Sequence, residues 1–286
     1  MRSDLDSLML YQHIDALLVT GGSAHNPAFY YFVGGAMLTA ADVIKVQGKD
    51  PVLFHTPMER DEAQRTGLAL SGYEAYPFES YLRAAQGDRA EAYARRYQSI
   101  LAGLGIERGR VLLCGREELG RVWAIFSRLQ QLMPALELVG ETENTLLMQA
   151  MSTKDASEVE RIRQMGRLTT TVVGRTADFL KSLRPAGDRL IDSGGRPVTI
   201  GQVKAKINLW LAELGAENPE GTIFAQGYDA AVPHSTGDDE TFLRQGVPIV
   251  FDIFPQEAGG GYFYDFTRTW CLGFASPEAE KLYEEV

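Results

Sequence analysis

The chain has few of the features that mark secreted or membrane proteins. It contains only two cysteines, Cys114 and Cys271, which lie far apart and outside any CxxC pattern, so neither a disulfide framework nor a thiolate metal cluster is indicated. No apolar run approaches the roughly 18 residues needed to cross a bilayer, and the acidic segment 1–6 does not have the basic start of a signal peptide. We therefore expect a cytoplasmic protein with reduced thiols and no membrane partner.

Positive charge is also scarce. Lys and Arg total 28 against 38 Asp and Glu, a formal net charge of −10, which repels a phosphate backbone and argues against a nucleic-acid partner. Hydrophobic residues make up 45% of the 286 residues and charged residues 23%, which is typical of a folded globular protein and excludes disordered and coiled-coil classes. The length favours two domains.

The first part of the chain alternates helical and strand-like segments, and the loop at 48–50 predicts a hairpin between two of the strands. We expect helices over 5–14, 58–66, 88–104 and 117–133, and strands over 16–20, 42–46, 51–55 and 110–114. This pattern predicts a small α/β domain covering residues 1–142.

A short helix at 143–151 and the loop-and-cap sequence 152–157 predict the domain boundary. Beyond it, apolar spacing predicts helices over 158–183 and 201–214, and from Thr222 onward Gly-rich turns separate β-branched and aromatic strands. We expect a second domain over 150–286, so the predicted fold class is α/β (α+β).

Two aspartates interrupt apolar strands near the end of the chain. Asp252 lies in the run 247–254 and Asp265 in the aromatic run 261–270, with a polar, Gly-rich loop between them. Antiparallel pairing of the two strands would place both carboxylates on one face. We expect Asp252 to be buried, where an isolated carboxylate requires a cation. Two facing acids therefore predict a divalent metal ion, or a pair of them.

Two further interpretations of these strands stay open. Arg268 or Arg244 could pair with the acids, which would make them purely structural. His234 follows a proline in a turn-rich loop upstream of Asp252. It could reach the same site, or it could be an incidental loop histidine.

Three strings carry a resemblance to a known family: GYDAAVPH at 227–234, FDIFP at 251–255 and GYFYDFTRT at 261–269. They resemble the pita-bread metallopeptidases, which include aminopeptidase P, prolidase, methionine aminopeptidase and creatinase. Residues 8–70 resemble the creatinase-type N-terminal domain, and 151–162 resemble the helix that opens the catalytic domain. The resemblance implies a creatinase-like N-terminal α/β domain followed by a pita-bread catalytic domain.

The resemblance also implies roles for individual residues. Asp252 would bind one metal, Asp265 would bridge two, and His234 would contact the substrate or the reaction's oxyanion. Thr267 would support a metal-binding side chain without binding the metal itself. The implied cofactors are two divalent ions, manganese foremost with cobalt or zinc as alternatives. The implied reaction is hydrolysis of an Xaa-Pro bond at the N-terminus of a small peptide, in a homodimer.

Weaker candidates for substrate contact are Tyr228, in the first string, and Asn26 and Tyr30 in the first domain. In the resembling family, N-terminal domains build oligomer contacts and border a neighbour's active site, which is the reason for naming Asn26 and Tyr30. A plain surface loop is the alternative for these two residues.

The chain departs from the family pattern in two ways. Phe254 stands where the family has a glycine after the first aspartate, which puts the shape of the substrate pocket in doubt. The family also uses a His and two Glu beyond the second aspartate, whereas the acids in the helix expected from Ser276 onward are those of a solvated face. We therefore expect the chain to be a piece of a longer protein and inactive alone.

The sequence leaves three other functions as alternatives to a metallopeptidase. A catalytically silent pita-bread module that binds peptides or proteins would not need the missing ligands. A creatinase-like amidinohydrolase works without metal, and the presence of both Asp252 and Asp265 argues against it. A doubly wound nucleotide-binding protein is disfavoured because the chain contains no GxGxxG motif.

Overall fold

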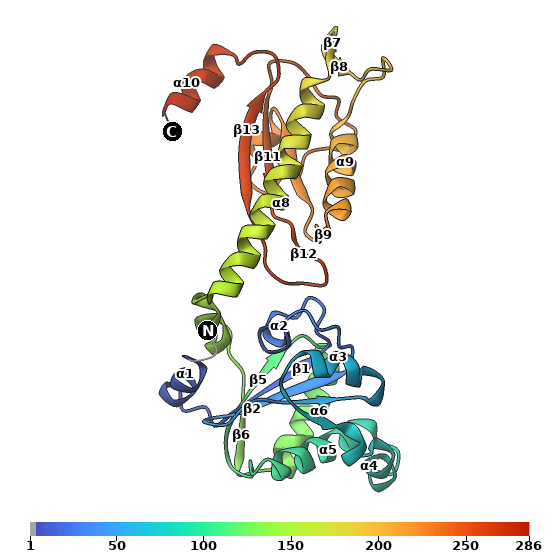
Figure 1. The fold of residues 1–286 in the computed structure, drawn as a ribbon, viewed down its shortest axis with the longest axis vertical. Helices are drawn as coiled ribbons and strands as arrows, with labels where there is room; N and C mark the ends of the chain where they lie inside the picture. Colours follow the sequence, from blue (N-terminus) through green and yellow to red (C-terminus); the bar gives the residue numbers. More distant parts are fainter. Residues whose placement is uncertain (1–3, 286) are drawn as a thin grey trace. The chain divides into compact units, whose positions relative to one another are not determined.

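The computed structural model describes residues 4–285 and divides the chain into two compact units (Figure 1). The first unit comprises the chain up to Asp155 together with Gly259–Gly261, and the second comprises Ala156–Ala258 and the chain from Tyr262 onward. The expected α/β class is confirmed. Within residues 4–285, no helix is both long enough and apolar enough to cross a membrane.

The first unit is built around a mixed sheet with the strand order β4-β3-β2-β1-β5-β6. Its strands are β1 (Ala16–Gly21), β2 (Ala41–Val46), β3 (Val52–His55), β4 (Ala69–Gly72), β5 (Gly109–Gly115) and β6 (Leu136–Val139). Its α-helices are α1 (Leu5–Tyr11), α2 (Pro27–Val33), α3 (Arg60–Arg65), α4 (Phe78–Ala84), α5 (Arg89–Gly103), α6 (Leu119–Leu132) and α7 (Leu146–Ser152), and 3-10 turns lie at η2 (Pro57–Glu59) and η3 (Tyr73–Ala75).

Helices cover both faces of this sheet, and the central strand β1 shows why. Leu17 and Val19 enter a core shared with α1, α2 and α7, whereas Ala16 and Leu18 enter a second core shared with α5 and α6. Successive side chains of a strand point to opposite faces, so a strand that is apolar on both faces needs two covering layers. The predicted hairpin is confirmed, because β2 and β3 pair antiparallel.

The second unit contains a three-stranded sheet of order β10-β11-β13. Its elements are α8 (Ala156–Lys181), β7 (Arg184–Ala186), β8 (Arg189–Ile191), α9 (Ile200–Glu213), β9 (Ala216–Glu217), β10 (Thr222–Gln226), η4 (Asp229–Ala231), β11 (Pro248–Ile253), β12 (Gln256–Glu257), β13 (Phe266–Cys271) and α10 (Pro277–Glu285). Figure 1 shows α8 lying along the sheet with α9 beside it.

The core of the second unit lies between these two helices and one face of the sheet. Met165 and Val172 of α8, Val203 of α9, and Phe224 and Phe251 of the sheet belong to the same buried cluster. Helix α9 begins with a capping box in which Thr199 and Gln202 satisfy each other's backbone N–H groups. The packed helices cover the face of β11 that carries Phe251 and Ile253, and Asp252 lies on the other face.

Candidate metal centre

The strands β11 and β13 pair antiparallel, which brings the predicted acidic residues to one place. Asp252 lies opposite Thr267 in this pairing. The Thr267 hydroxyl donates a hydrogen bond of 2.5 Å to Oδ1 of Asp252. This hydrogen bond is the kind of contact that the role predicted for Thr267 requires. The role itself stays a prediction.

Asp265 faces Asp252 across the same surface. It lies one residue before β13 and two residues before Thr267, so the two-residue period of an extended chain turns both side chains to the same side. Partial burial raises the pKa of the Asp265 carboxyl, as do the charge of Asp252 and a hydrogen bond shared with the Asp252 side chain. The two carboxyl groups are therefore close enough to interact, on the one face that antiparallel pairing predicts.

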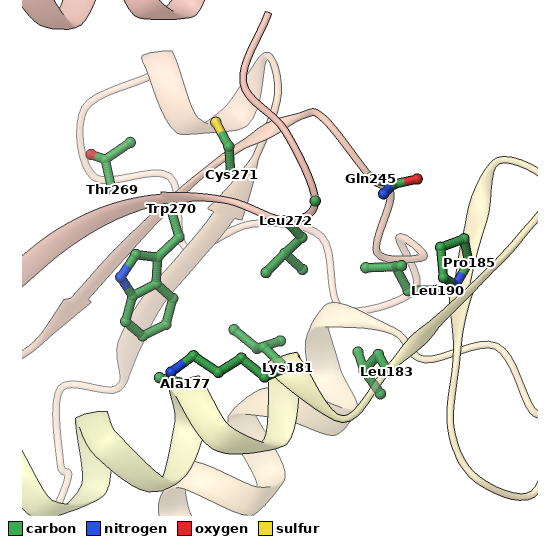
Figure 2. A pocket seen from close by; sticks show the side chains of 12 residues that line it. Ala177, Lys181, Leu183, Pro185, Leu190, Gln245, Thr269, Trp270, Cys271 and Leu272 are labelled. Atoms are coloured by element: carbon green, nitrogen blue, oxygen red, sulfur yellow. The ribbon is translucent and has the colours of Figure 1, made fainter.

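This surface is the side of the sheet that faces away from α8. Figure 2 shows the alternation along β13: Trp270 and Leu272 point toward α8, whereas Thr269 and Cys271 point the other way. Thr267 shares the side of Thr269 because the two are two residues apart. The acidic pair consequently lies on the face that α8 and α9 do not cover.

Neither arginine considered as a structural partner pairs with the acids. Arg268 lies opposite Phe251, on the α8 side of the sheet, and its guanidinium stacks 3.9 Å from the centroid of the Phe266 ring. The backbone N–H of Arg244 donates to Gln226. Among residues 4–285, no ion pair joins Asp252 or Asp265 to a cation. The pair is thus a concentration of negative charge that a bound cation would neutralise.

One prediction about these acids is wrong. Asp252 is half-buried rather than buried, and Asp265 is exposed. The run 247–254 is apolar on both faces, but helices cover only the face that carries Phe251 and Ile253. An apolar run in the sequence therefore does not by itself show that these carboxylates are removed from water. Their closeness to each other is the stronger electrostatic feature.

His234 lies beside the same sheet, in an exposed loop that follows η4. Two residues later, the carbonyl of Thr236 accepts a hydrogen bond from the Phe224 N–H of β10, which is the neighbour of β11. The loop therefore flanks the sheet, although His234 forms no hydrogen bond or ion pair with either acid. Tyr228 lies immediately before η4 and is 85% exposed. The roles of both residues stay predictions.

Asn26 and Tyr30 lie in the first unit, in and beside helix α2 rather than in a plain surface loop. Asn26 is buried and caps the helix, because its Oδ1 accepts from the Phe29 N–H at 3.3 Å and its Nδ2 donates to the Thr20 carbonyl at 3.1 Å. Tyr30 is half-buried within the helix. The cap accounts for the polar atoms of Asn26, and substrate contact by either residue stays a prediction.

The acidic pair fits part of a divalent-metal centre. Carboxylate oxygens are the donors that hard divalent ions prefer, and two carboxyl groups in contact supply them from opposite sides. Across residues 4–285, however, no three His, Cys, Asp or Glu side chains lie close enough together to hold a metal ion. Within the described chain, Asp252 and Asp265 would hold such an ion, with water or other ligands completing its coordination.

A separate cleft of about 470 Å³ lies at the other end of β13 (Figure 2). Leu180, Leu190 and Leu272 give it an apolar lining, and Lys181 and Gln245 border it. Asp265 precedes β13, whereas the cleft adjoins Cys271 at the end of the strand, about 20 Å away at the usual rise per residue. The cleft is therefore distinct from the acidic pair.

Comparison with solved structures finds the same fold in three peptidases. A prolidase from Pyrococcus furiosus is 17% identical over 98% of this chain and 68% of its own length, with a TM-score of 0.64. An X-Pro aminopeptidase from Thermotoga maritima is 20% identical over 94% and 66%, with a TM-score of 0.66. A dipeptidase from Pyrococcus horikoshii is 20% identical over 99% and 69%, with a TM-score of 0.69. No curated protein matches the chain in sequence.

Residues 160–286 match the model of metallopeptidase family M24. The predicted resemblance to this pita-bread family is confirmed. The M24 match contains His234, Asp252, Asp265 and Thr267, whereas Asn26 and Tyr30 lie outside it. The chain spans 66–69% of the length of the three structures, and at 17–20% identity the likeness establishes the fold.

Proposed function

We propose that the chain belongs to a divalent-metal-dependent peptidase that hydrolyses Xaa-Pro bonds at the N-termini of peptides. The observation that carries this proposal is the contact between Asp252 and Asp265 on an open sheet surface without a cationic partner among residues 4–285. The M24 match and the fold shared with prolidases and an X-Pro aminopeptidase support a peptidase. The choice of proline-containing substrates rests on that likeness alone.

Each residue of the site has a definite task in this proposal. Asp252 and Asp265 hold the ion, and the Thr267 hydroxyl fixes the orientation of the Asp252 carboxylate. An ion held by these two carboxylates would supply Lewis-acid chemistry to the hydrolysis. His234 donates a hydrogen bond to the carbonyl oxygen as negative charge develops there. Tyr228, on the same loop, contacts the peptide.

The finer points of the proposal rest on chemistry and on the family. Two manganese ions are proposed because carboxylate ligands suit hard divalent ions, with cobalt or zinc as alternatives. A homodimer in the cytoplasm is proposed from the resemblance and from the composition. Light scattering on the purified protein tests the dimer, and metal analysis after purification without added metal tests the ion.

The decisive experiment measures metal content and peptide cleavage together. The 286-residue chain and a form extended to the stop codon of its reading frame are each compared with Asp252→Asn. We expect the extended form to bind about two metal ions and to cleave a peptide with proline at the second position, and the Asp252→Asn form to do neither. An extended form that binds manganese normally but cleaves no Xaa-Pro peptide would refute the assigned substrate.

A second candidate is a peptide-binding module without catalysis. It is favoured by the absence, within residues 4–285, of a third metal-ligating side chain beside the two acids. Such a protein would purify without stoichiometric metal, gain none on dialysis and still bind a proline-containing peptide with unchanged affinity after Asp252→Asn. The same set of samples therefore separates the two functions.

A further inference from the structure

Asp265 is carried by a short arm, residues 262–265, that leads into β13. Backbone hydrogen bonds pair this arm with the segment around β12: the Tyr264 N–H donates to the Pro255 carbonyl, and the Glu257 N–H donates to the Tyr262 carbonyl, both at 3.1 Å. These bonds fix the register of the arm. They do not fix the distance between the arm and α8, which depends on how the side chains between them pack.

Gly166 of α8 lies directly against the ring of Tyr264. A Cβ placed on Gly166 would be 2.7 Å from Cε2 and 3.0 Å from Cζ of that ring, closer than a real Cβ approaches another carbon. Glycine weakens a helix interior, so a glycine in a long helix indicates a close packing partner. Gly174, further along α8, has no atom within 4 Å of the corresponding position.

The alternation of the extended chain links this contact to the acidic pair. Tyr264 packs with the core on the α8 side, so the next residue, Asp265, points to the open face where Asp252 lies. Tyr264 and Asp265 are consecutive residues. A displacement of the Tyr264 ring relative to α8 therefore also displaces the Asp265 carboxyl.

Two ties hold the rest of the arm to the start of α8. Arg161 forms a bidentate ion pair with Glu257, with N···O distances of 3.0 and 2.6 Å, and its guanidinium lies 5.0 Å from the centroid of the Tyr262 ring. The Tyr262 hydroxyl donates to the buried carboxylate of Glu158. A bidentate Arg–carboxylate pair restricts orientation as well as distance, so these ties keep the arm pressed onto α8.

We propose that Gly166 is a positioning residue of the metal centre: the space it leaves on α8 seats the Tyr264 ring, and that seat sets the position of Asp265 beside Asp252. This inference rests on the proposed function, because it assigns the arm to the placement of a metal-binding carboxylate. Loss of the seat displaces one of the two carboxylates without removing it.

Three variants of the 286-residue chain test the proposal, with Mn²⁺ alone as the probe. Gly166→Ala should weaken Mn²⁺ binding about 10-fold, as expected for loss of a group that orients a ligand. Tyr264→Leu removes the ring atoms nearest Gly166 and should also weaken binding, and adding Gly166→Ala to it should fill the gap and recover most of the affinity. Gly174→Ala is the matched control and should leave the affinity unchanged.

Mn²⁺ affinity is read from the free-ion spin-resonance signal, and amide hydrogen exchange of residues 262–267 is measured without metal. We expect faster exchange in Gly166→Ala than in Gly174→Ala. If the two variants show the same exchange and affinity, the proposal is overturned. Faster exchange with unchanged affinity overturns it as well. If Gly166→Ala does not fold, the double variant alone tests the proposal. Adding Gly166→Ala to Tyr264→Leu should then recover most of the Mn²⁺ affinity, and no recovery overturns the proposal.

Failure of the proposed function has a different signature. In that case Asp252→Asn would leave the Mn²⁺ affinity of the otherwise unchanged chain as it was. The metal-free exchange measurement would still show whether Gly166 seats Tyr264, because it requires no bound ion.

Discussion

In the first unit, Asp42 lies inside the sheet at 3% exposure and accepts hydrogen bonds from the hydroxyls of Tyr73 and Tyr97. In the second unit, Asp252 receives one hydroxyl, from Thr267, and otherwise meets another carboxyl group. Both arrangements place an acid within a sheet. They differ in whether the protein itself supplies enough donors for the negative charge.

The donors around Asp42 are supported in turn by a cation. The Arg96 guanidinium stacks 4.0 Å from the centroid of the Tyr73 ring. Burial raises the pKa of Tyr73 and Tyr97 well above the usual range, and the negative charge of Asp42 adds to this effect, so both hydroxyls remain protonated donors. A carboxylate satisfied in this way is a structural element.

The two sites show how a structural acid differs from an acid that could bind a ligand: the protein supplies enough hydrogen-bond donors to the first and too few to the second. A charge buried between two covered faces of a sheet needs hydrogen-bond partners from the protein, and Asp42 has them in Tyr73 and Tyr97. The second unit covers one face of its sheet, and two acids accumulate on the other. Within residues 4–285, no ion pair joins either of them to a cation.

The difference between the two units is tested most directly by removing one acid of the Asp252 and Asp265 pair. Asp252→Asn and Asp265→Asn should each weaken Mn²⁺ binding by about 100-fold or more, beyond what loss of an orienting group costs. Neither should lower the free energy of unfolding, because each relieves repulsion between carboxyl groups. Asp178→Asn, an exposed charge on α8, is the control. Equal losses of affinity in all three would mean that only net charge matters.

The reverse result is expected for the acid of the first unit. Asp42→Ala should lower the free energy of unfolding by about 2–6 kcal/mol, since it leaves two buried hydroxyls without their acceptor at roughly 1–3 kcal/mol each. Mn²⁺ affinity should not change. Urea unfolding beside the exposed control Asp50→Ala checks this, and a stable Asp42→Ala protein would contradict the structural role.

Glu158 allows the distinction to be tested within the second unit. Because it is 5% exposed and accepts from the Tyr262 hydroxyl, it should behave like Asp42. Tyr262→Phe should cost about 1.5 kcal/mol of unfolding free energy, the low end for a hydrogen bond to a charged group. Tyr283→Phe, at an 82% exposed tyrosine of α10, should cost nothing measurable. Equal stabilities of the two variants would count against this assignment.

The smallest expected effect is on pH dependence. The pKa of Asp265 is raised from its usual 3.8, first by partial burial and then by the charge of Asp252, so the folded chain holds this proton more tightly than the unfolded chain. Its contribution to stability is then greatest below the usual value and declines as pH rises through the raised pKa.

Asp252→Asn removes the neighbouring charge and should shift the titration of Asp265 to lower pH. Carbon NMR of the Asp265 carboxyl in both proteins measures this directly. An identical titration midpoint would show that the two carboxyl groups do not interact in solution.

Local patterns predicted most of the regular structure. The helix expected over 88–104 is α5 at Arg89–Gly103, and the strand expected over 16–20 is β1 at Ala16–Gly21. The helix expected from Ser276 begins at Pro277, and the Ser276 hydroxyl caps it by accepting from the Ala279 N–H. These elements have long periodic runs or strong caps, which act within a few residues.

The elements that were not predicted are short or depend on distant partners. Helix α4 has seven residues after a proline, and β6 and β7 have four and three, too few for a periodic signal. The tie between Glu158 and Tyr262 joins residues 104 positions apart. A glutamate near the start of a helix gives no local sign of such a partner.

The sequence by itself indicated that Asp252 and Asp265 can share a face, because the two-residue period of an extended chain puts both on one side when their strands pair antiparallel in a suitable register. Tertiary structure alone decided that this face is uncovered, that Arg268 points away from it, and that Tyr264 rests on Gly166. Side-chain period is a property of the backbone over a few residues. Which layer covers a face, and which cation reaches it, depends on the packing of segments far apart in the chain.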